Sequence, residues 1–368
     1  MGRSLLLLCF ICLFGTGESW GSDPAPEPRV IGGIVSGNSE LPWQAYLNMT
    51  YRTNGTVRTF ICGGVVISPD VVVTAAHCLR NDGETVSVND IEVWAGITSI
   101  FSASASNAVS VRELVIHPSY NAFRFANDIA ILKLSSALPD TVVPIQVATT
   151  DEQFDADLAF NSGWVDNGER IANLLVSGWG STDPSDPNSG STRLRQTLLS
   201  GVPDFRCDSL WGANITGLDY PIYLCAGSTS PDLARDSCFG DSGGPLVWQN
   251  PQRAGDSDFG LRLVGLVSFG EGCAGRLPGV YTETATYRDW IAAEVGESIF
   301  GQPTPSFKVN PFEADYPAEN EEGVTTITID NTGGDSGGGS LSWWWLCAVG
   351  WLALYRRRRV VPASSLQQ

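Results

Sequence analysis

Residues 240–245, Gly-Asp-Ser-Gly-Gly-Pro, constrain this chain more than any other feature of its sequence. They place Ser242 between glycines, directly after an aspartate. A serine hydroxyl is a weak nucleophile at neutral pH, and it needs a base to take its proton and a carboxylate to orient that base. His77, in Thr-Ala-Ala-His-Cys, and Asp128, in Asn-Asp-Ile-Ala, are candidates for these roles. The sequence therefore predicts nucleophilic serine chemistry.

Six of the nine cysteines lie in the body of the chain and form an even set. They are Cys62, Cys78, Cys207, Cys225, Cys238 and Cys273, whereas the other three fall in apolar terminal stretches. In an exported chain such a set indicates a disulfide framework, although spacing alone does not choose among the possible pairings. None of these six cysteines forms a CxxC pair, which argues against a structural zinc site among them.

Short apolar runs separated by turn residues fill the body of the chain, and the full sequence contains 40 glycines. Many short runs with few helical patterns predict an all-β barrel or sandwich. The expected strands are 44–50, 64–67, 71–74, 91–95, 109–116, 129–134, 174–176, 244–248, 261–269 and 279–282. The formal net charge of −18 argues against a nucleic-acid partner. It fits equally well the acidic surface of a secreted protein.

The order of these motifs, His then Asp then Ser, resembles that of the chymotrypsin/trypsin family of serine proteases. The resemblance covers residues 30–297 and implies two six-stranded antiparallel β-barrels with a C-terminal helix at 289–295. The active site would lie in the cleft between the barrels. It implies that His77 is the general base, Asp128 orients it, and Ser242 attacks the scissile carbonyl.

The same resemblance implies the surroundings of the nucleophile. The backbone N–H groups of Gly240 and Ser242 would form an oxyanion hole. The disulfides would be Cys62–Cys78, Cys207–Cys225 and Cys238–Cys273. A further family bridge is absent at both ends, because Leu174 and Trp248 stand at its two positions. A catalytically inactive binding protein on this fold is the alternative, but such proteins usually lose a triad residue or the activation site, and this chain keeps both.

Substrate specificity is implied by Asp236, which precedes Ser242 by six residues. In trypsin-like members a carboxylate at this spacing lies at the base of the S1 pocket, with Ser237 beside it. A buried carboxylate without a counter-ion favours a cationic P1 residue, here Arg or Lys. The alternative is that Asp236 pairs with a neighbouring cation. The further site residues implied are Ser268, Gly270 and Gly279 in the pocket walls and Phe125 on the S2 side.

The N-terminal region resembles that of a secreted zymogen. Residues 1–22 contain a basic start and an apolar run typical of a signal peptide, and 23–29 form a brief propeptide. Arg29 and Val30 open Arg-Val-Ile-Gly-Gly, which resembles the family's activation site. Cleavage after Arg29 by a trypsin-like protease would free the Val30 ammonium to pair with Asp241, the residue before the nucleophile.

The C-terminal region predicts an acidic Pro- and Gly-rich linker over 298–340, a short apolar segment with a basic cluster over 341–359, and a tail over 360–368. The apolar run 341–355 gives a helix of about 22 Å, which is short for a bilayer core of about 30 Å. Four arginines follow it and should remain cytoplasmic, which places the protease outside.

This tail resembles the GlyGly-CTERM sorting signal of Gram-negative bacteria. The resemblance implies cleavage near the glycines by a rhomboid-type protease and release to the cell surface or medium. Permanent single-pass anchoring is the alternative. A GPI signal normally ends in its apolar run, and an animal membrane-anchored protease would usually keep a propeptide cysteine, which residues 14–60 lack.

Together these features predict a secreted trypsin-like serine endopeptidase that acts on proteins and peptides with Arg or Lys at P1. We expect no cofactor and no required metal, because residues 97–101 carry no acidic side chain where pancreatic trypsins bind calcium. His117, the only other histidine, is expected to be structural. The sequence assigns no role to the acidic insertion 151–166.

Overall fold

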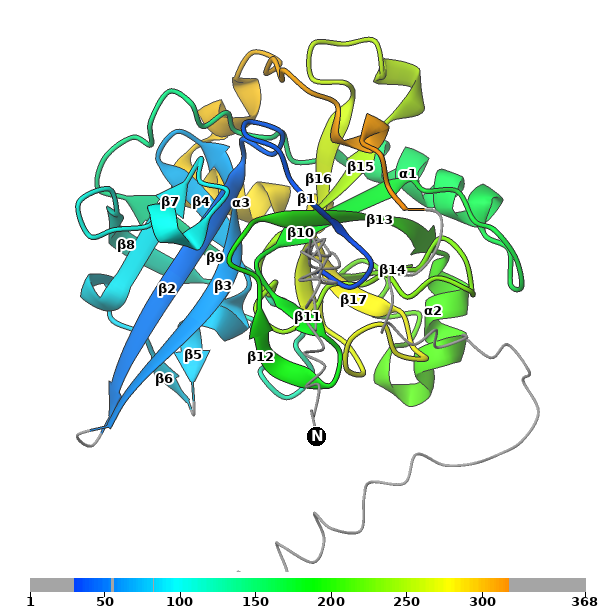
Figure 1. The fold of residues 1–368 in the computed structure, drawn as a ribbon, viewed down its shortest axis with the longest axis horizontal. Coiled ribbons are helices and arrows are strands. Elements are labelled where there is room, and N and C mark those ends of the chain that lie inside the picture. The colour runs from blue at the N-terminus through cyan, green and yellow to red at the C-terminus, as the bar shows by residue number, and fades with distance from the viewer. Residues whose placement is uncertain (1–29, 54–55, 82, 318–368) are drawn as a thin grey trace, which may run out of the picture. The chain divides into compact units, whose positions relative to one another are not determined.

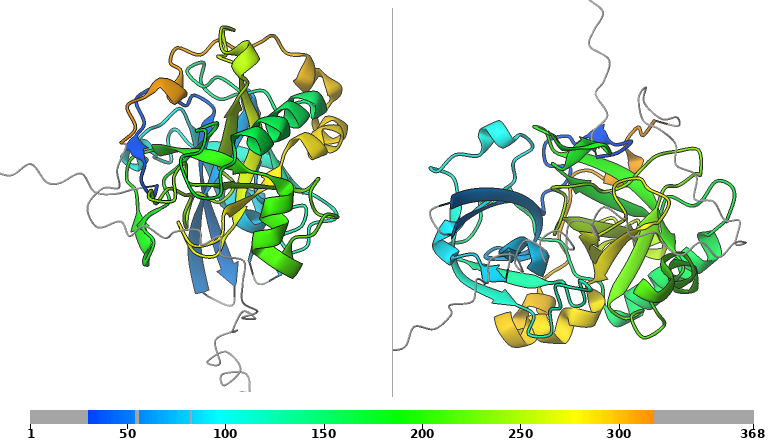
Figure 2. Two further views of the ribbon diagram at one scale, coloured as in Figure 1. Left: turned by 90° about the vertical axis from the view of Figure 1, so that its right-hand side faces the viewer. Right: turned by 90° about the horizontal axis from the view of Figure 1, so that it is seen from below.

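The computed structural model describes residues 30–53, 56–81 and 83–317, which form two β-barrels side by side (Figures 1 and 2). The first barrel is closed in the order β2-β3-β4-β9-β8-β7, with antiparallel pairing throughout. Its strands are β2 Gln44–Thr53, β3 Thr56–Ser68, β4 Val71–Thr74, β7 Ile91–Ala95, β8 Val109–Ile116 and β9 Ala130–Leu134.

The second barrel follows the order β13-β10-β15-β16-β17-β14 and is closed by pairing of β13 with β14, with β1 at the edge beside β13. Its strands are β1 Ile34–Val35, β10 Leu174–Gly178, β13 Arg195–Val202, β14 Tyr223–Gly227, β15 Pro245–Gln249, β16 Leu261–Phe269 and β17 Gly279–Glu283. The prediction of two six-stranded antiparallel barrels is confirmed. The expected strands did not include β13 and β14; Arg195, Gln196 and Thr197 are buried in β13, so its sequence is not an apolar run.

Helices and short hairpins connect the barrel strands. The helices are α1 Thr150–Gly163, α2 Asp204–Trp211 and α3 Arg288–Val295, the last at the expected place. The two hairpins are β5 Arg80–Asn81 with β6 Glu84–Thr85, and β11 Ser181–Asp183 with β12 Asp186–Gly190. The 3₁₀ turns are η1 Ala76–Leu79, η2 Val88–Asp90, η3 Ile100–Ser102, η4 Gly212–Asn214, η5 Pro251–Arg253, η6 Ala285–Tyr287, η7 Glu297–Gly301 and η8 Pro311–Glu313.

The acidic insertion 151–166 forms most of α1. Thr149 caps this helix, because its hydroxyl accepts a hydrogen bond from Glu152 N while the Glu152 carboxylate accepts one from Thr149 N. Such a capping box satisfies two N–H groups that the first turn cannot bond internally.

Aromatic residues fill the seam between the barrels. Tyr46 of β2 contacts Trp179, which follows β10, edge to face at 5.3 Å between ring centroids. Trp43, just before β2, is fully buried in the same cluster. Burial of large rings contributes most of the apolar area available to a seam of this kind.

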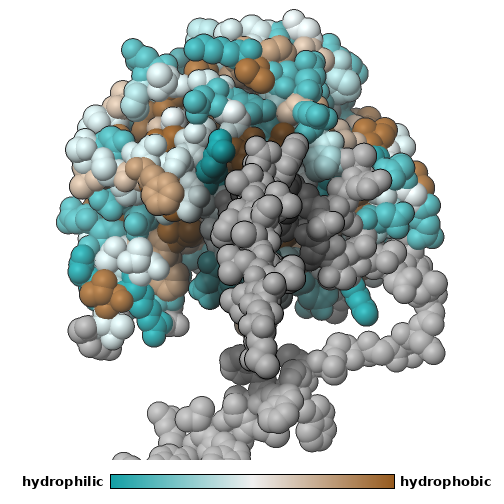
Figure 3. All heavy atoms as spheres, viewed as in Figure 1, coloured by the Kyte–Doolittle hydropathy of each residue, from teal (hydrophilic) through white to brown (hydrophobic). Residues whose placement is uncertain are grey.

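On the surface shown in Figure 3, apolar residues are scattered among polar ones.

The three disulfides confirm the expected pairing: Cys62–Cys78, Cys207–Cys225 and Cys238–Cys273. The two positions of the absent family bridge, Leu174 of β10 and Trp248 of β15, are register partners across neighbouring strands. Both are buried, so apolar packing replaces the covalent link there.

Residues 298–317 pack onto the protein, whereas the sequence predicts a linker from 298 onward. Phe307 is 5% exposed and contacts Trp43 edge to face at 4.7 Å. Phe300, Phe312 and Tyr316 pack against the same cluster. The average composition of the segment hides these spaced aromatic residues. We call residues 297–317 the C-terminal strap; the rest of the predicted linker lies outside the described residues.

Within the part of the chain that the structure describes, no helix is long and apolar enough to cross a membrane. The predicted signal peptide 1–22, propeptide 23–29, apolar segment 341–359 and tail 360–368 all lie outside that part.

Candidate active site

His77 and Asp128 form a hydrogen-bonded pair at one end of the first barrel. His77 lies in η1, directly after β4, and Asp128 precedes β9. Because β4 pairs with β9, the ends of the two strands meet. His77 Nδ1 donates to Asp128 Oδ2 at 2.7 Å, and the His77 backbone N–H donates to Oδ1 at 2.8 Å. The carboxylate therefore holds both the ring and its backbone.

Ser268 of β16 adds a third hydrogen bond to the same carboxylate. Its Oγ donates to Asp128 Oδ2 at 2.5 Å, and Thr282 Oγ1 of β17 donates to the Asp128 carbonyl at 2.9 Å. The sequence predicts Ser268 only as a pocket residue. Two residues of the second barrel thus hold the aspartate that bonds to His77 in the first.

The His77 pKa is set by two opposing effects. Burial of the imidazole lowers its pKa, while the charge of Asp128 and the hydrogen bond to it raise the pKa, and the net result lies above 6.5. Asp128 is fully buried, whereas the His77 side chain is 21% exposed. An imidazole with one nitrogen fixed by a carboxylate and partial access to the cleft can act as a general base.

Ser242 lies in the turn before β15 and close to His77. Gly63 N donates to the Ser242 carbonyl at 2.8 Å. Cys78 Sγ lies 3.6 Å from that carbonyl oxygen and 4.0 Å from His77 Nε2. The Cys62–Cys78 disulfide therefore sits between the two residues and places the turn next to the imidazole.

Gly240 and Gly243 allow the sharp turn on either side of Asp241 and Ser242. Gly240 has φ +100°, and Gly243 has φ +74° with no room for a Cβ, which would lie 2.1 Å from Thr74 Oγ1. Neither Gly240 N nor Ser242 N donates a hydrogen bond to another described residue. Two nearby backbone N–H groups without an acceptor among the described residues are able to bind an oxyanion.

Asp241 is a buried carboxylate without a cationic partner among the described residues. Its oxygens accept hydrogen bonds from Gly180 N at 2.7 Å and Cys238 N at 2.8 Å. Burial raises its pKa to about 6. Among the described residues no Lys, Arg or His nitrogen lies within 4.0 Å of it. Val30 is fully buried in the core of the second barrel.

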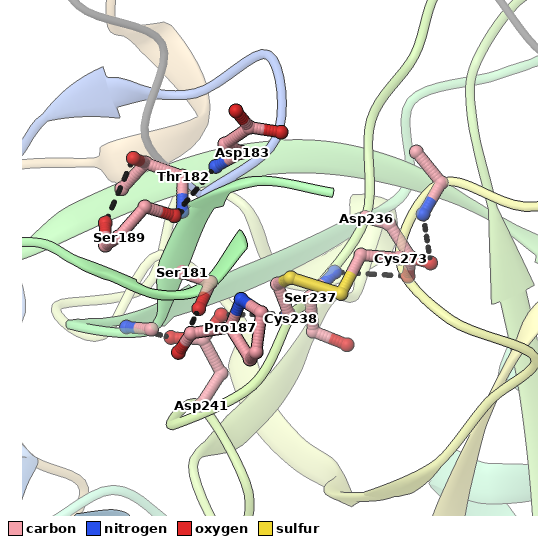
Figure 4. The surroundings of a disulfide bond; sticks show 12 residues. Ser181, Thr182, Asp183, Pro187, Ser189, Asp236, Ser237, Cys238, Asp241 and Cys273 are labelled. Carbon is pink, nitrogen blue, oxygen red and sulfur yellow. Dashed lines mark hydrogen bonds between the residues drawn. A yellow bond between two sulfur atoms is a disulfide. The ribbon is translucent and has the colours of Figure 1, made fainter. Parts of the chain in front are cut away.

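Asp236 lies beside the Cys238–Cys273 disulfide (Figure 4). Its carboxylate is 5% exposed and accepts hydrogen bonds from Ala274 N at 2.8 Å and Ser237 N at 2.9 Å. Burial raises its pKa to about 7 against the opposing effect of these bonds. The sequence left open that Asp236 pairs with a neighbouring cation, but no Lys, Arg or His nitrogen of the described residues lies within 4.0 Å of its carboxylate.

The space around Asp236 is kept open by glycines. A Cβ on Gly279 would lie 2.9 Å from Asp236 Oδ1, and the Cβ position of Gly270 is 4.0 Å from Gly279 Cα. Ser237 Oγ lies 3.1 Å from Tyr281 Oη near the same carboxylate. Asp236, Ser237, Gly270 and Gly279 therefore lie close together, whereas the hydroxyl of the fifth predicted S1 residue, Ser268, bonds to Asp128.

An aromatic wall lies next to His77, and most of it is missed by the sequence analysis. Phe125, expected on the S2 side, contacts His77 edge to face at 5.5 Å. It stacks on Phe269 at 5.5 Å, and Phe269 also contacts Trp211 and Tyr223. Phe269 stands between two predicted site residues, Ser268 and Gly270, and this position in the sequence could have indicated that it lies near the site.

His117 packs between Tyr287 and Trp290, with ring centroids 5.2 and 4.9 Å away, and burial lowers its pKa. In the described residues the one group of ligand side chains close enough to share a metal ion is Cys62, Cys78 and His77. Both of these cysteines are oxidised to a disulfide, so they offer no thiolate.

Residues 30–291 match the family model described as Trypsin. Trypsin alpha-4 of Lucilia cuprina is 34% identical over 80% of this chain and 98% of its own length. The Homo sapiens protein named transmembrane protease serine 5 is 34% identical over 74% of this chain and 52% of its own. A Bos taurus protein, suppressor of tumorigenicity 14 protein homolog, is 32% identical, and the match covers 73% of this chain but only 28% of that protein.

Proposed function

Because the chain belongs to the trypsin family and is a serine endopeptidase, we propose that it cleaves peptide bonds after Arg or Lys. We further propose that it is made as a zymogen and becomes active when the bond after Arg29 is cut. The observation that supports this specificity is the buried Asp236 carboxylate, which has no cationic partner among the described residues and lies beside Gly279.

The proposed reaction uses the His77–Asp128 pair in both halves. Ser242 Oγ attacks the scissile carbonyl carbon while His77 Nε2 takes the hydroxyl proton. The N–H groups of Gly240 and Ser242 bind the oxyanion that forms. His77 then gives its proton to the leaving amine, and an acyl-enzyme remains on Ser242. Water, deprotonated by His77, hydrolyses this ester and restores the serine.

The P1 side chain would reach Asp236 between Gly270 and Gly279. A substrate guanidinium or ammonium there supplies the charge that the buried carboxylate lacks. The backbone of Ser268 and Gly270, at the end of β16, would pair with the substrate as an added strand. Phe125, beside His77, would bound the S2 side.

Activation would depend on Asp241 and Val30. Burying a carboxylate without a partner is costly, and the ammonium released by cleavage after Arg29 supplies one. Pairing of the Val30 ammonium with Asp241 would hold the turn that carries the N–H groups of Gly240 and Ser242. The zymogen lacks this ammonium, so we expect it to be inactive.

An Arg29→Gln variant tests this activation. Treatment of the wild-type zymogen with a trypsin-like protease should produce an N-terminus at Val30 and full peptidase activity. The variant should remain uncut at that bond and inactive, because glutamine does not fit a pocket that requires a cation. N-terminal sequencing and a reporter-peptide assay, run on both proteins, measure the two effects. Equal activity of the treated variant and wild type would contradict activation at Arg29.

We propose export through the signal peptide 1–22 and transient membrane attachment through 341–359. The support is the sequence resemblance to the GlyGly-CTERM signal. A rhomboid-type protease would then remove the tail and release the enzyme to the cell surface or medium. Mass spectrometry of the mature C-terminus should find an end near the glycines at 333–339; a released form that keeps Arg359 would contradict processing.

A further inference from the structure

The C-terminal strap runs from the end of α3 back toward the N-terminal segment (orange, top of Figure 1). The match to the family model ends at residue 291, so the strap lies beyond it. Its middle is docked by Phe307, which is buried against Trp43, and by two hydrogen bonds with Ser257: Phe307 N donates to Ser257 O at 3.0 Å, and Ser257 Oγ donates to Pro305 O at 2.9 Å.

The end of the strap is hydrogen-bonded to β13, the strand that pairs with β1 of the N-terminal segment. Tyr316 Oη accepts a hydrogen bond from Gln196 Nε2 at 2.9 Å and donates one to Pro311 O at 2.8 Å. Gln196 is fully buried in β13 and is the register partner of Ile34 in β1. Its Oε1 also accepts from Ser36 Oγ at 2.9 Å. The Gln196 amide therefore joins the strap to residues 34–36.

Arg235 makes a second connection between the strap and the N-terminal segment. Its guanidinium donates to the carbonyl of Pro317 and, at 3.2 Å, to Thr229 Oγ1. Its Cγ lies 2.9 Å from where a Cβ on Gly32 would stand, so the arginine lies against that glycine. Arg235 is 7% exposed, and within the described chain no carboxylate lies within 4.0 Å of its guanidinium. The Pro317 carbonyl is therefore an important acceptor for a buried charge.

The residue after Arg235 is Asp236, which forms a β-bridge with Ile31. The strap, Arg235, Ile31 and the S1 carboxylate thus form one continuous set of contacts. The proposed activation pairs Val30 with Asp241. Val30 is the first residue of the N-terminal segment and is buried in the second barrel, and Asp241 precedes β15 of the same barrel.

We propose that the C-terminal strap is a clamp that holds the cleaved N-terminal segment in its inserted, active position, with Tyr316 and Arg235 as positioning residues. This inference rests on the proposed activation by Val30 and Asp241. Contacts can shift a conformational equilibrium only if they differ between its two states. Gln196 and Arg235 each contact both the strap and residues 32–36, so we expect release of the segment to weaken their contacts with the strap.

The pH dependence of activity reports this equilibrium. The Val30 ammonium pairs with Asp241 only when protonated, so its pKa is raised in the inserted state above the usual value of about 8. Activity is then present below that raised pKa and is lost as the pH rises through it. A weaker clamp favours the released segment and moves this alkaline midpoint to lower pH.

The test uses activated full-length protein carrying Tyr316→Phe or Phe307→Ala. Tyr316→Phe removes one hydroxyl and leaves the Gln196 amide without that acceptor. We expect each variant to lower the alkaline midpoint of kcat/KM by about one pH unit, the shift that a tenfold change in the insertion equilibrium produces. If Phe307→Ala does not fold, Tyr316→Phe carries the test alone.

Tyr220→Phe is the matched control. Tyr220 Oη donates to Asp208 Oδ2 at 3.0 Å, away from the strap contacts and from His77, so its loss should lower the melting temperature and leave the alkaline midpoint in place. A wild-type midpoint that neither strap variant moves, or that Tyr220→Phe moves equally, would overturn the clamp alone. A wild-type enzyme with no alkaline loss of activity would overturn the proposed activation and the clamp together.

Discussion

Replacement of Ser242 by alanine is expected to lower kcat on Arg-containing reporter peptides by about 10⁶-fold. Alanine has no hydroxyl to attack the carbonyl, and the hydrogen-bonded pair of His77 and Asp128 then has no nucleophile to activate. The residual rate would come from substrate binding and the N–H groups of the oxyanion hole. KM should change little, because Ser242 Oγ contributes to the chemical step more than to binding.

Steady-state kinetics of the activated variant measure this effect. Ser106→Ala is a suitable control, since Ser106 lies on an exposed loop of the first barrel and bonds only to Ser104. The control should match wild type in kcat and KM. Turnover by Ser242→Ala at more than a few per cent of the wild-type rate would contradict its role as nucleophile.

Replacement of Asp236 by serine should remove the preference for Arg and Lys at P1. The cationic side chain would then be buried without a counter-ion, which costs about 3–5 kcal/mol, or about 10³-fold in kcat/KM.

The wild-type enzyme should itself lose affinity for cationic substrates as the pH falls through about 7. Burial raises the pKa of Asp236 to about 7, and the neutral form that predominates below that pH attracts no cation.

Competing peptides that differ only at P1, one with Arg and one with an uncharged residue, measure this preference. Asp256→Ser is the matched control, since the Asp256 side chain is 42% exposed and pairs with Arg253, and its loss changes net charge equally. The control should keep the wild-type ratio of kcat/KM values. An unchanged Arg preference in Asp236→Ser would refute the pocket assignment.

The barrel architecture could be predicted from the sequence because the motifs around His77, Asp128 and Ser242 occur in the same order as in one family, and all three indicate the same fold. The strands missed are instructive. β13 buries Gln196 and Thr197, whose side chains are satisfied by contacts with distant residues such as Ser36 and Gly32. No local hydrophobic pattern can show that a polar side chain has such a partner.

Other contacts could not be predicted from the sequence either, because they join residues that are far apart in the chain. The hydrogen bond from Ser268 to Asp128 joins residues 140 positions apart, and only the packing of the two barrels creates it. The sequence predicts a linker in place of the strap because the aromatic residues of this segment are spaced among prolines and polar residues, and each of them docks at a separate place. The disulfide pairing followed from the family resemblance alone, since spacing does not distinguish the alternatives.

A cleavage-site profile of the protein cut after Arg29 tests the central claim most directly. A mixture of peptides covering all residues at P1 would be digested and the products sequenced by mass spectrometry, with Ser242→Ala as the parallel sample. We predict cleavage after Arg and Lys by the wild type and no such cleavage by the variant. Cleavage after other residues, or none by protein with a free Val30 N-terminus, would contradict the account.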